Sequence, residues 1–375
     1  MSQPNAHTML ARQSPDEMAQ QRFVLAVKRH VMGKLRPDIG TVYELEAEPK
    51  WRAEHGQSPK DRFEAEAALN ATSHYRFTKA LDRAAQEMMW QTIGETVYRE
   101  RPRLEALSQI LTTGPDRLGS LTLNPDFRID PVYRDCHIHL QPEGYCPPDN
   151  GKSVTAGAFY ESGGRLYSMG RGIGKEDSKA GAVIAWLETL RPGWKPKRIL
   201  DMGCSAGGAS TVYAKAFPEA EIHAIDLGES MLRYAHARAE ALKVPVHFRQ
   251  ASATETGYAT GSFDLVVSHN ILHEMSGNAR RGMAVESLRL LTPDGLCIHQ
   301  DVDLLLHDRE VWEQAERAYD NDYNNEPFWI EYTTCDFTSE LKDSGFVSVE
   351  EAKIPKTAGP GYWHAWIAHN GETQG

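Results

Sequence analysis

The amino-acid sequence predicts an α/β protein in which a helical N-terminal domain precedes a largely parallel sheet covered by helices. Three observations predict this fold. Apolar residues recur at helical spacing in the first third of the chain, and strand-like and helix-like runs alternate from residue 197 onward. The last strand-like run also follows its predecessor too closely for a crossover helix. We therefore expect three regions, residues 1–120, 121–190 and 191–375.

Residues 1–120 are predicted to form a helical domain that serves as a substrate lid, as a dimerisation surface or as both. The run "SPDEMAQQRFVLAVKRHVMGKL" begins with a serine cap, a proline and two acidic residues, and places Phe23, Val27 and Val31 on one stripe. The run "RFTKALDRAAQEMMWQTIGETVY" repeats this pattern, starting at Phe77. Its residues 88–90 favour core or dimer packing over substrate contact, because large apolar side chains are mostly buried.

Residues 121–190 are predicted to be an irregular connecting and lid segment. Glycine, proline and aromatic residues dominate "NPDFRIDPVYRDCHIHLQPEGYCPPDNG" and its continuation. Long irregular stretches in compact proteins are usually linkers or site-forming loops, and the tyrosines and histidines here favour a site. The run "EDSKAGAVIAWLETL" then predicts a helix that leads into the first strand of the sheet.

Residues 191–375 are predicted to contain the sheet. Five strand-like runs, "RILDMG", "EIHAIDL", "VPVHFRQA", "FDLVVSHN" and "GLCIHQDV", alternate with helical or turn-rich segments, which predicts parallel strands with right-handed crossovers. The final runs, "FVSVEEAKI" and "GYWHAWIAHN", are joined by a short connection, so the last strand must be antiparallel. The segment after the fifth strand is longer than a crossover helix requires, which indicates an insertion at about 304–330.

Composition excludes several classes of function. A net charge of −11 argues against a nucleic-acid surface, which needs clustered lysine and arginine. The five cysteines are scattered without a C-x-x-C pair, so we expect neither a disulfide framework nor a zinc ribbon, and a reducing cytoplasm fits best. No apolar run approaches a membrane span, and the N-terminus lacks a signal-peptide core. We therefore expect a cytoplasmic protein with small-molecule partners.

The loop "DMGCSAGGAS" can be interpreted in two ways. Gly203, Ser205 and Gly207 spell the G-x-S-x-G turn of a serine nucleophile, while Gly203, Ser205 and Gly208 nearly spell the G-x-G-x-x-G of nucleotide-binding folds. The loop follows the first strand of its domain, so no earlier strand supplies an oxyanion hole. Doubly wound sheets bind ligands at this position, against a helix N-terminus. Topology therefore favours a cofactor loop.

The residues around this loop indicate the kind of cofactor. The side chain of Ser205 would obstruct a pyrophosphate, and the carboxylate of Asp201 would repel phosphate but suits ammonium or hydroxyl groups. Asp226, about 20 residues after the glycines, can accept hydrogen bonds from both hydroxyls of a ribose. Together they predict a nucleoside that carries an amino acid.

Four motifs in order resemble the class I S-adenosylmethionine-dependent methyltransferases, of the small-molecule type similar to quinone-biosynthesis methyltransferases. They are "ILDMGCSAGG", "AIDLGESMLRYAHARA", "GSFDLVVSHNILHEM" and "ESLRLLTPDGLCIHQD". The resemblance extends from Lys197 to about His369. It implies a Rossmann-like, doubly wound sheet of seven strands with the last strand antiparallel, and S-adenosyl-L-methionine as cofactor.

The resemblance also implies cofactor-binding residues. Asp201, Gly203 and Gly207 would surround the methionine end of the cofactor, and Asp226 would bind its ribose. Ser205 and Ser252 depart from the family pattern, in which a glycine and an acidic residue are usual. The full set of expected cofactor contacts is Tyr160, Arg171, Asp201, Gly203, Ser205, Gly207, Asp226, Leu227, Met231, Ser252, Ala253 and Ser268.

Methyl transfer from a sulfonium is an in-line displacement, so the enzyme must mainly align the acceptor and remove its proton. His269 follows the fourth strand and is a candidate general base, and His273 with Glu274 is a second. Capping of the following helix is the alternative for both histidines. His139 and Tyr145 complete the catalytic candidates, on a lid over the acceptor.

Two polar segments, residues 135–141 and 323–326, offer candidate ligands for a metal ion or for the substrate. If "DCHIHLQPEGYC" were extended, Asp135, His137 and His139 would share one face and suit a metal, but further ligands at a definite spacing are missing. We therefore expect no metal, and a polar lid to which Gln141 contributes. The insertion supplies the remaining expected substrate ligands, Tyr323, Asn324, Asn325 and Glu326; a solvated helix face is the alternative.

The predicted function is S-adenosylmethionine-dependent transfer of a methyl group to an oxygen, nitrogen or sulfur atom of a small molecule. The expected partners are that acceptor and a second copy of the chain in a homodimer, with neither nucleic acid nor membrane. Two alternatives remain at this stage: a serine hydrolase that uses Ser205, and a non-catalytic protein that keeps the fold for binding.

Overall fold

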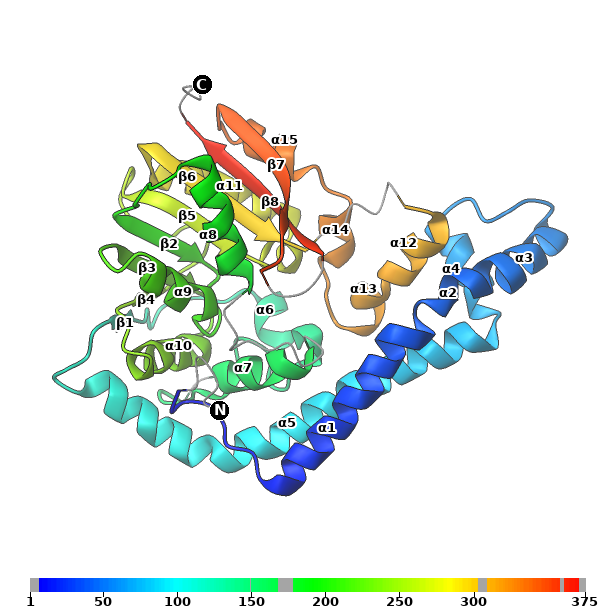
Figure 1. Ribbon diagram of the computed structural model, residues 1–375, viewed down its shortest axis with the longest axis horizontal. Coiled ribbons are helices and arrows are strands. Elements are labelled where there is room, and N and C mark those ends of the chain that lie inside the picture. The colour runs from blue at the N-terminus through cyan, green and yellow to red at the C-terminus, as the bar shows by residue number, and fades with distance from the viewer. Residues whose placement is uncertain (1–6, 149, 168–177, 303–308, 358–360, 371–375) are drawn as a thin grey trace.

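The computed structural model describes residues 7–148, 150–167, 178–302, 309–357 and 361–370 (Figure 1). One sheet of eight strands has helices on both faces, and a layer of long helices crosses one end of it. Among the described residues, no helix combines the length and the apolar character needed to cross a lipid bilayer.

The sheet has the strand order β1-β4-β3-β2-β5-β6-β8-β7. In chain order the strands are β1 (Ser120–Thr122), β2 (Arg198–Met202), β3 (Glu221–Asp226), β4 (His247–Gln250), β5 (Phe263–His269), β6 (Leu291–Asp301), β7 (Ser348–Pro355) and β8 (Tyr362–His369). Strand β8 runs antiparallel to both of its neighbours, and the remaining pairs are parallel. The predicted α/β class and the antiparallel last strand are confirmed. The short strand β1 beside β4 was not predicted and adds an eighth strand.

Each face of the sheet has its own apolar core, because successive residues of a strand point to opposite faces. Ile199 and Val267 lie in the core under α8 (Ser178–Leu190), α9 (Gly208–Ala216) and α10 (Glu229–Ala241). Leu200 and Val266 lie in the other core, with α11 (Gly277–Leu290) and α15 (Phe337–Asp343). Strands buried on both faces need continuous apolar runs, which is why "RILDMG" and "FDLVV" do not alternate.

The N-terminal helices are α1 (Pro15–His30), α2 (Asp38–Val42), α3 (Glu48–His55), α4 (Arg62–Asn70) and α5 (Ser73–Thr113), with short π-helical turns between them. Helix α1 begins at a capping box in which Ser14 and Glu17 bond each other's backbone. It lies along α5, the long cyan helix of Figure 1. Met89 and Trp90 of α5 are buried in a core with α7 (Thr155–Tyr167) and α10.

The predicted apolar stripes are correct only in part. Val31 and Ile93 are fully buried, whereas Phe23 is 63% exposed and Phe77 is 58% exposed. The buried faces of the helices also carry polar side chains, among them Lys28 of α1 and Asp82 and Gln86 of α5. These three residues line a cavity, so these helices use part of their inner face for a polar site rather than for an apolar core.

The segment 121–190 is more ordered than its composition suggested. It contains α6 (Pro131–Asp135), α7 and α8. Helix α7 packs against both α5 and α10. A Cβ atom at Gly157 would lie 2.3 Å from the Cβ of Tyr234, and one at Gly163 would lie 2.5 Å from a ring carbon of Trp90. The glycines of α7 therefore permit close packing against α5 and α10, although glycine in a sequence usually indicates a loop.

The close approach of Gly157 to Tyr234 leads to a prediction about stability. Replacing Gly157 with alanine is expected to lower the free energy of unfolding by about 1–3 kcal/mol, because the methyl group would overlap Tyr234 and force α7 away from α10. Urea denaturation followed by circular dichroism measures this loss. The control is Gly33→Ala, where a Cβ meets nothing within 4 Å and stability is expected to stay level or rise. Equal effects of the two variants would contradict the prediction.

The predicted insertion connects the sheet to the N-terminal helices. It contains α12 (Val311–Arg317), α13 (Tyr319–Tyr323) and α14 (Trp329–Thr333). Trp312 and Ala315 of α12 pack in a small apolar core with Ile39 and Leu69 from the N-terminal region. Segments far apart in the sequence therefore pack together beside the sheet (Figure 1).

Candidate active site

A first cavity of about 280 Å³ lies beyond the carboxyl ends of β2, β3 and β4. The loop after β2 forms one wall with Gly203 and Ser205, and Asp226 at the end of β3 forms another. Apolar side chains cover much of the remainder: Ile225, Leu227, Met231, Ala251, Ala253, Ile271 and Met275. The cavity therefore combines an apolar slot with the carboxylates of Asp226, Asp130 and Glu274.

The loop after β2 is held in a left-handed conformation that directs its backbone toward β3. Gly203, Ser205 and Gly207 have φ values of 72°, 49° and 73°. Glycine adopts such values readily, whereas they cost a serine on the order of 1 kcal/mol. The N–H of Ser205 donates a hydrogen bond to Asp226 Oδ2 at 2.9 Å. This bond stabilises the strained turn and joins the two walls.

Asp226 is placed to bind hydroxyl groups. Its Oδ2 accepts the Ser205 N–H, and its Oδ1 accepts the Gly228 N–H at 3.0 Å. Burial raises the pKa of this carboxyl group above its ordinary value, although the backbone donors oppose that shift. A carboxylate has about four lone-pair positions, so two backbone donors leave room for two hydroxyl donors from a ligand. The residues present therefore fit a ribose.

The structure separates the expected cofactor contacts into two groups. Those that line the first cavity are Tyr160, Gly203, Ser205, Asp226, Leu227, Met231, Ser252 and Ala253. Asp201, Gly207 and Ser268 are not among its lining residues. Asp201 accepts a hydrogen bond from Ser210 Oγ at 2.6 Å, and Ser268 Oγ lies 2.8 Å from His299 Nδ1. Arg171 lies outside the described residues.

A second, larger cavity of about 730 Å³ adjoins the first. The two share Tyr145, Tyr160, Asn270 and Glu274 as common wall residues. Residues of α5, α7, the insertion and the segment after α1 enclose the second cavity, among them Trp90, Tyr167, Arg317 and Asp320. A group bound in one cavity can therefore approach a group bound in the other.

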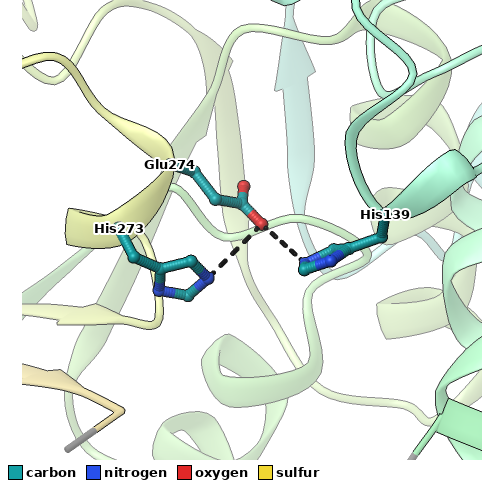
Figure 2. A group of neighbouring side chains, drawn as sticks. All are labelled: His139, His273 and Glu274. Carbon is teal, nitrogen blue, oxygen red and sulfur yellow. Dashed lines mark ion pairs between the residues drawn. The ribbon is translucent and has the colours of Figure 1, made fainter. Parts of the chain in front are cut away.

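Figure 2 shows His139, His273 and Glu274 close together. All three line the second cavity, and Glu274 also lines the first. Glu274 Oε1 lies 3.3 Å from His139 Nε2 and 3.9 Å from His273 Nε2. Tyr145 donates a hydrogen bond from its hydroxyl to the same oxygen at 3.3 Å. The histidines approach from opposite sides, with the carboxylate between them. We call these three residues the His–His–Glu cluster.

Two further carboxylates hold the histidine rings. Glu326 Oε1 lies 2.6 Å from His139 Nδ1, and Asp301 Oδ1 lies 2.6 Å from His273 Nδ1. Burial alone would lower the pKa of each imidazole, but these acidic neighbours outweigh it. The pKa of His139 is raised well above its usual value, and that of His273 is raised to about 9. Both rings are therefore hydrogen-bond donors at neutral pH when no other cation is bound.

The backbone at His139 depends on the N-terminal helix α5. His139 has a φ of 54°, which is strained for a side chain of this size. Its carbonyl oxygen accepts hydrogen bonds from Gln86 Nε2 at 3.0 Å and from Trp90 Nε1 at 2.6 Å. These donors of α5 stabilise a conformation that the local sequence would disfavour.

The other expected catalytic and substrate residues have mixed positions. His269 lies between Tyr213 and Gln300, at 3.0 and 3.1 Å, and is not among the lining residues of either cavity. It is therefore not retained as a catalytic candidate. Gln141 lines the second cavity. Asn324 and Glu326 line a smaller cavity of about 280 Å³ that contains His139 and His273.

Two members of the insertion do not line these cavities. Tyr323 stacks on Tyr319, with ring centroids 5.3 Å apart. Asn325 donates a hydrogen bond from its side chain to the His137 carbonyl at 3.3 Å. Neither residue is among the lining residues of the second or the smaller cavity. The sequence identified the segment but not which of its side chains turn inward.

The metal-binding face considered from the sequence is not formed. Asp135 ends helix α6 and pairs with Arg134 at the surface, at 2.7 Å. His139 instead lies within a turn of 3-10 helix and meets His273 and Glu274. The serine-hydrolase alternative also lacks its base, because no histidine is among the described residues that line the cavity around Ser205.

Comparison with known proteins shows which family part of the chain resembles. Residues 199–295 match the family described as methyltransferase domain. An uncharacterized protein of Haemophilus influenzae is 31% identical over 37% of this chain and 57% of its own. Phosphoethanolamine N-methyltransferase 1 of Arabidopsis thaliana is 38% identical over 22% of this chain and 16% of its own. Malonyl-(acyl-carrier protein) O-methyltransferase of Legionella pneumophila is 35% identical over 21% of this chain and 27% of its own. The chain thus spans between a sixth and three fifths of the length of these relatives.

Proposed function

We propose that this chain, whose residues 199–295 form a class I S-adenosylmethionine-dependent methyltransferase domain, methylates a small molecule bound in its second cavity. The observation that carries the proposal is the common wall of the two cavities, formed by Tyr145, Tyr160, Asn270 and Glu274. In-line displacement requires that acceptor and donor meet along one axis, and adjoining cavities allow this. Bound S-adenosylmethionine would supply an electrophilic methyl group.

The first cavity is proposed to hold the cofactor. Asp226 accepts hydrogen bonds from the ribose hydroxyls, and Leu227 and Met231 pack beside the adenine together with Ser252 and Ala253. The loop at Gly203 and Ser205 holds the methionine end. The ring of Tyr160 borders both cavities, where an aromatic face would stabilise a sulfonium cation.

The His–His–Glu cluster is proposed to handle the acceptor's proton and charge. The Glu274 carboxylate borders both cavities, so it can accept a proton from an acceptor hydroxyl, amine or thiol at the junction. His139 and His273 can donate hydrogen bonds to an anionic acceptor atom, and Tyr145 orients the carboxylate. Gln141, Asn324 and Glu326 are the proposed substrate contacts. The N-terminal helices act as a lid, and their exposed Phe23 and Phe77 are proposed to form a homodimer surface.

The direct test is incubation with methyl-labelled S-adenosylmethionine and a panel of thiols, amines, phenols and carboxylates. Transfer of label to one class identifies the acceptor atom. Isothermal titration calorimetry with S-adenosylmethionine and its demethylated product accompanies the assay. An absence of both binding and transfer would remove the proposal, whereas binding without transfer to any acceptor would favour the non-catalytic alternative.

Ser205→Ala separates methyl transfer from hydrolysis. We expect kcat/KM for methyl transfer to stay within about 3-fold of the value of the unchanged chain. The hydrogen bond from Ser205 to Asp226 is donated by the backbone N–H, which alanine keeps. A serine hydrolase would instead lose nearly all activity on p-nitrophenyl acetate. The two assays on the same variant decide between these functions.

A further inference from the structure

We propose that His139, His273 and Glu274 are ligands of a divalent transition-metal ion at the junction of the two cavities. The three ligand atoms all lie within 4.8 Å of one another. His139 Nε2 and His273 Nε2 lie 3.3 and 3.9 Å from Glu274 Oε1. Ligand atoms around a tetrahedral zinc ion stand about 3.4 Å apart, given bonds of about 2.0–2.1 Å. The side chains are thus near coordination distance without a change of backbone (Figure 2).

The orientation of the rings is the second observation. Each histidine has its Nδ1 atom held by a buried carboxylate, Glu326 for His139 and Asp301 for His273. This leaves Nε2 of both rings directed at the same oxygen of Glu274. A carboxylate on the far ring nitrogen is the usual support of a histidine that binds metal, because it fixes the ring and makes it a better donor. Asp301 is itself held by the N–H groups of Leu272 and Val302.

Glu326 supplies a third observation. It is 1% exposed, and its Oε2 atom accepts no hydrogen bond within the described part of the chain. That oxygen lies 4.0 Å from His273 Nε2, a member of the His–His–Glu cluster. A buried carboxylate oxygen that accepts no hydrogen bond destabilises the folded state. A metal ion between Glu326 Oε2 and His273 Nε2 would remove that cost. We assign Glu326 as a further ligand or as the group that holds a metal-bound water.

The surrounding charge favours a cation. Glu274 and Glu326 each face both histidines, Asp301 contacts His273, and Asp320 lies within hydrogen-bond reach of Asn324 beside them. Several carboxylates in one buried volume repel each other, and a divalent ion is the strongest local means of offsetting that repulsion. Two imidazoles with one carboxylate form a donor set that suits zinc, iron(II) or cobalt(II) more than magnesium.

The role of the ion rests on the proposed function. With the ion bound, His139, His273 and Glu274 would act as its ligands and would not take the proton-handling roles given to the metal-free site. Three protein ligands leave coordination positions open, as in catalytic rather than structural metal sites. His139 and His273 line the second cavity, while Glu274 borders both, so an open position would face the acceptor. An acceptor that presents an anionic oxygen, nitrogen or sulfur donor would bind there, next to the methyl group. The acceptor class is therefore a small metal-chelating molecule.

The test is metal binding to the full chain after treatment with a chelator. Titration with Zn²⁺ by calorimetry is expected to give one ion per chain, and Co²⁺ is expected to give the visible absorption of nitrogen and oxygen coordination. His273→Gln and Glu274→Gln are expected to weaken Zn²⁺ binding at least about 100-fold, and Asp301→Asn, at a positioning residue, about 10–100-fold. Circular dichroism checks that each variant is folded.

His137→Gln is the matched control, because His137 is an exposed histidine two residues from His139. Its Zn²⁺ affinity is expected to equal that of the unchanged chain, while His139→Gln loses it. The proposal is overturned if the unchanged chain binds neither ion, or if His137→Gln and His139→Gln weaken binding equally. Should a variant not fold, the Co²⁺ spectrum of the unchanged chain still decides. S-adenosylmethionine titration of the same samples tests the proposed function separately.

Discussion

Asp226→Asn is expected to weaken the binding of S-adenosylmethionine by about 100-fold or more. The carboxylate already accepts the N–H groups of Ser205 and Gly228, and Asp226 lines the cavity. Asparagine has one acceptor oxygen, so it must release a loop N–H or a ligand hydroxyl. Hydrogen bonds to a charged group contribute about 1.5–3 kcal/mol each, and two of them correspond to at least two orders of magnitude in affinity. Calorimetric titration measures the loss.

The matched control for this variant is Asp264→Asn. Asp264 Oδ2 accepts the N–H groups of Lys197 and Arg198, at 2.7 and 3.0 Å, so it makes the same kind of contact outside both cavities. Its substitution is expected to lower stability slightly and to leave cofactor affinity unchanged. If Asp226→Asn bound the cofactor within about 3-fold of the unchanged chain while fully folded, Asp226 would not be a cofactor contact.

Glu161→Ala is expected to lower the free energy of unfolding by about 3–5 kcal/mol, the largest loss among the variants proposed, because it removes the carboxylate that pairs with the buried Arg238. Glu161 of α7 is 4% exposed and bonds Arg238 Nε at 2.9 Å, the Tyr234 hydroxyl at 2.5 Å and His7 Nε2 at 3.0 Å. It thereby joins α7 to α10 and to the start of the chain. Denaturation in urea measures the change in the free energy of unfolding.

Glu229→Ala provides the comparison for Glu161→Ala. Glu229 pairs with Arg233 on the partly exposed side of α10, at 3.2 Å, and a pair of this kind contributes less than about 1 kcal/mol. Both variants remove a glutamate that faces an arginine of α10, so the difference between them isolates the effect of burial. Losses of similar size would show that Glu161 does not organise this interface.

The same carboxylate predicts a dependence of stability on pH. Burial alone would raise the pKa of Glu161, but Arg238 and the hydrogen bonds from His7 and Tyr234 lower it to about 2, from an ordinary 4.5. A pKa lowered in the folded state stabilises the protein above the unfolded value. The advantage of the unchanged chain over Glu161→Gln should therefore be full above pH 4.5 and shrink as pH falls toward 2. Parallel denaturation curves at several pH values test this; a constant difference would contradict it.

The sequence identified most of the residues that line the first cavity, because they are local in the sequence. Gly203, Asp226, Leu227 and Met231 stand at or just after the ends of two consecutive strands, and parallel strands bring those ends together. Asp201 was expected at the cavity and instead accepts a hydrogen bond from Ser210, because it still lies within β2 and its side chain faces α9. The family pattern specifies position along the chain but not which way a side chain turns.

The helical layer was predicted in kind but not in detail. The apolar stripes were correct only in part. Helices α1 and α5 turn polar residues such as Lys28 and Gln86 toward a cavity, so hydrophobic periodicity does not identify the whole of their inner face. Helix α7 was missed because its glycines, needed for contact with Tyr234 and Trp90, indicate a loop when only the sequence is considered.

By itself the sequence determined the class of the sheet, its antiparallel last strand and the loop that faces Asp226, because these depend on alternation, spacing and short motifs. Only the tertiary structure decided that His139, His273, Glu274 and Glu326 form one site. These residues come from a strained turn, a 3-10 turn and an insertion, and packing against α5 and the N-terminal helices brings them together. No periodicity in the sequence links such positions. Contacts between segments that are distant in the chain bring them together, and local sequence patterns do not encode those contacts.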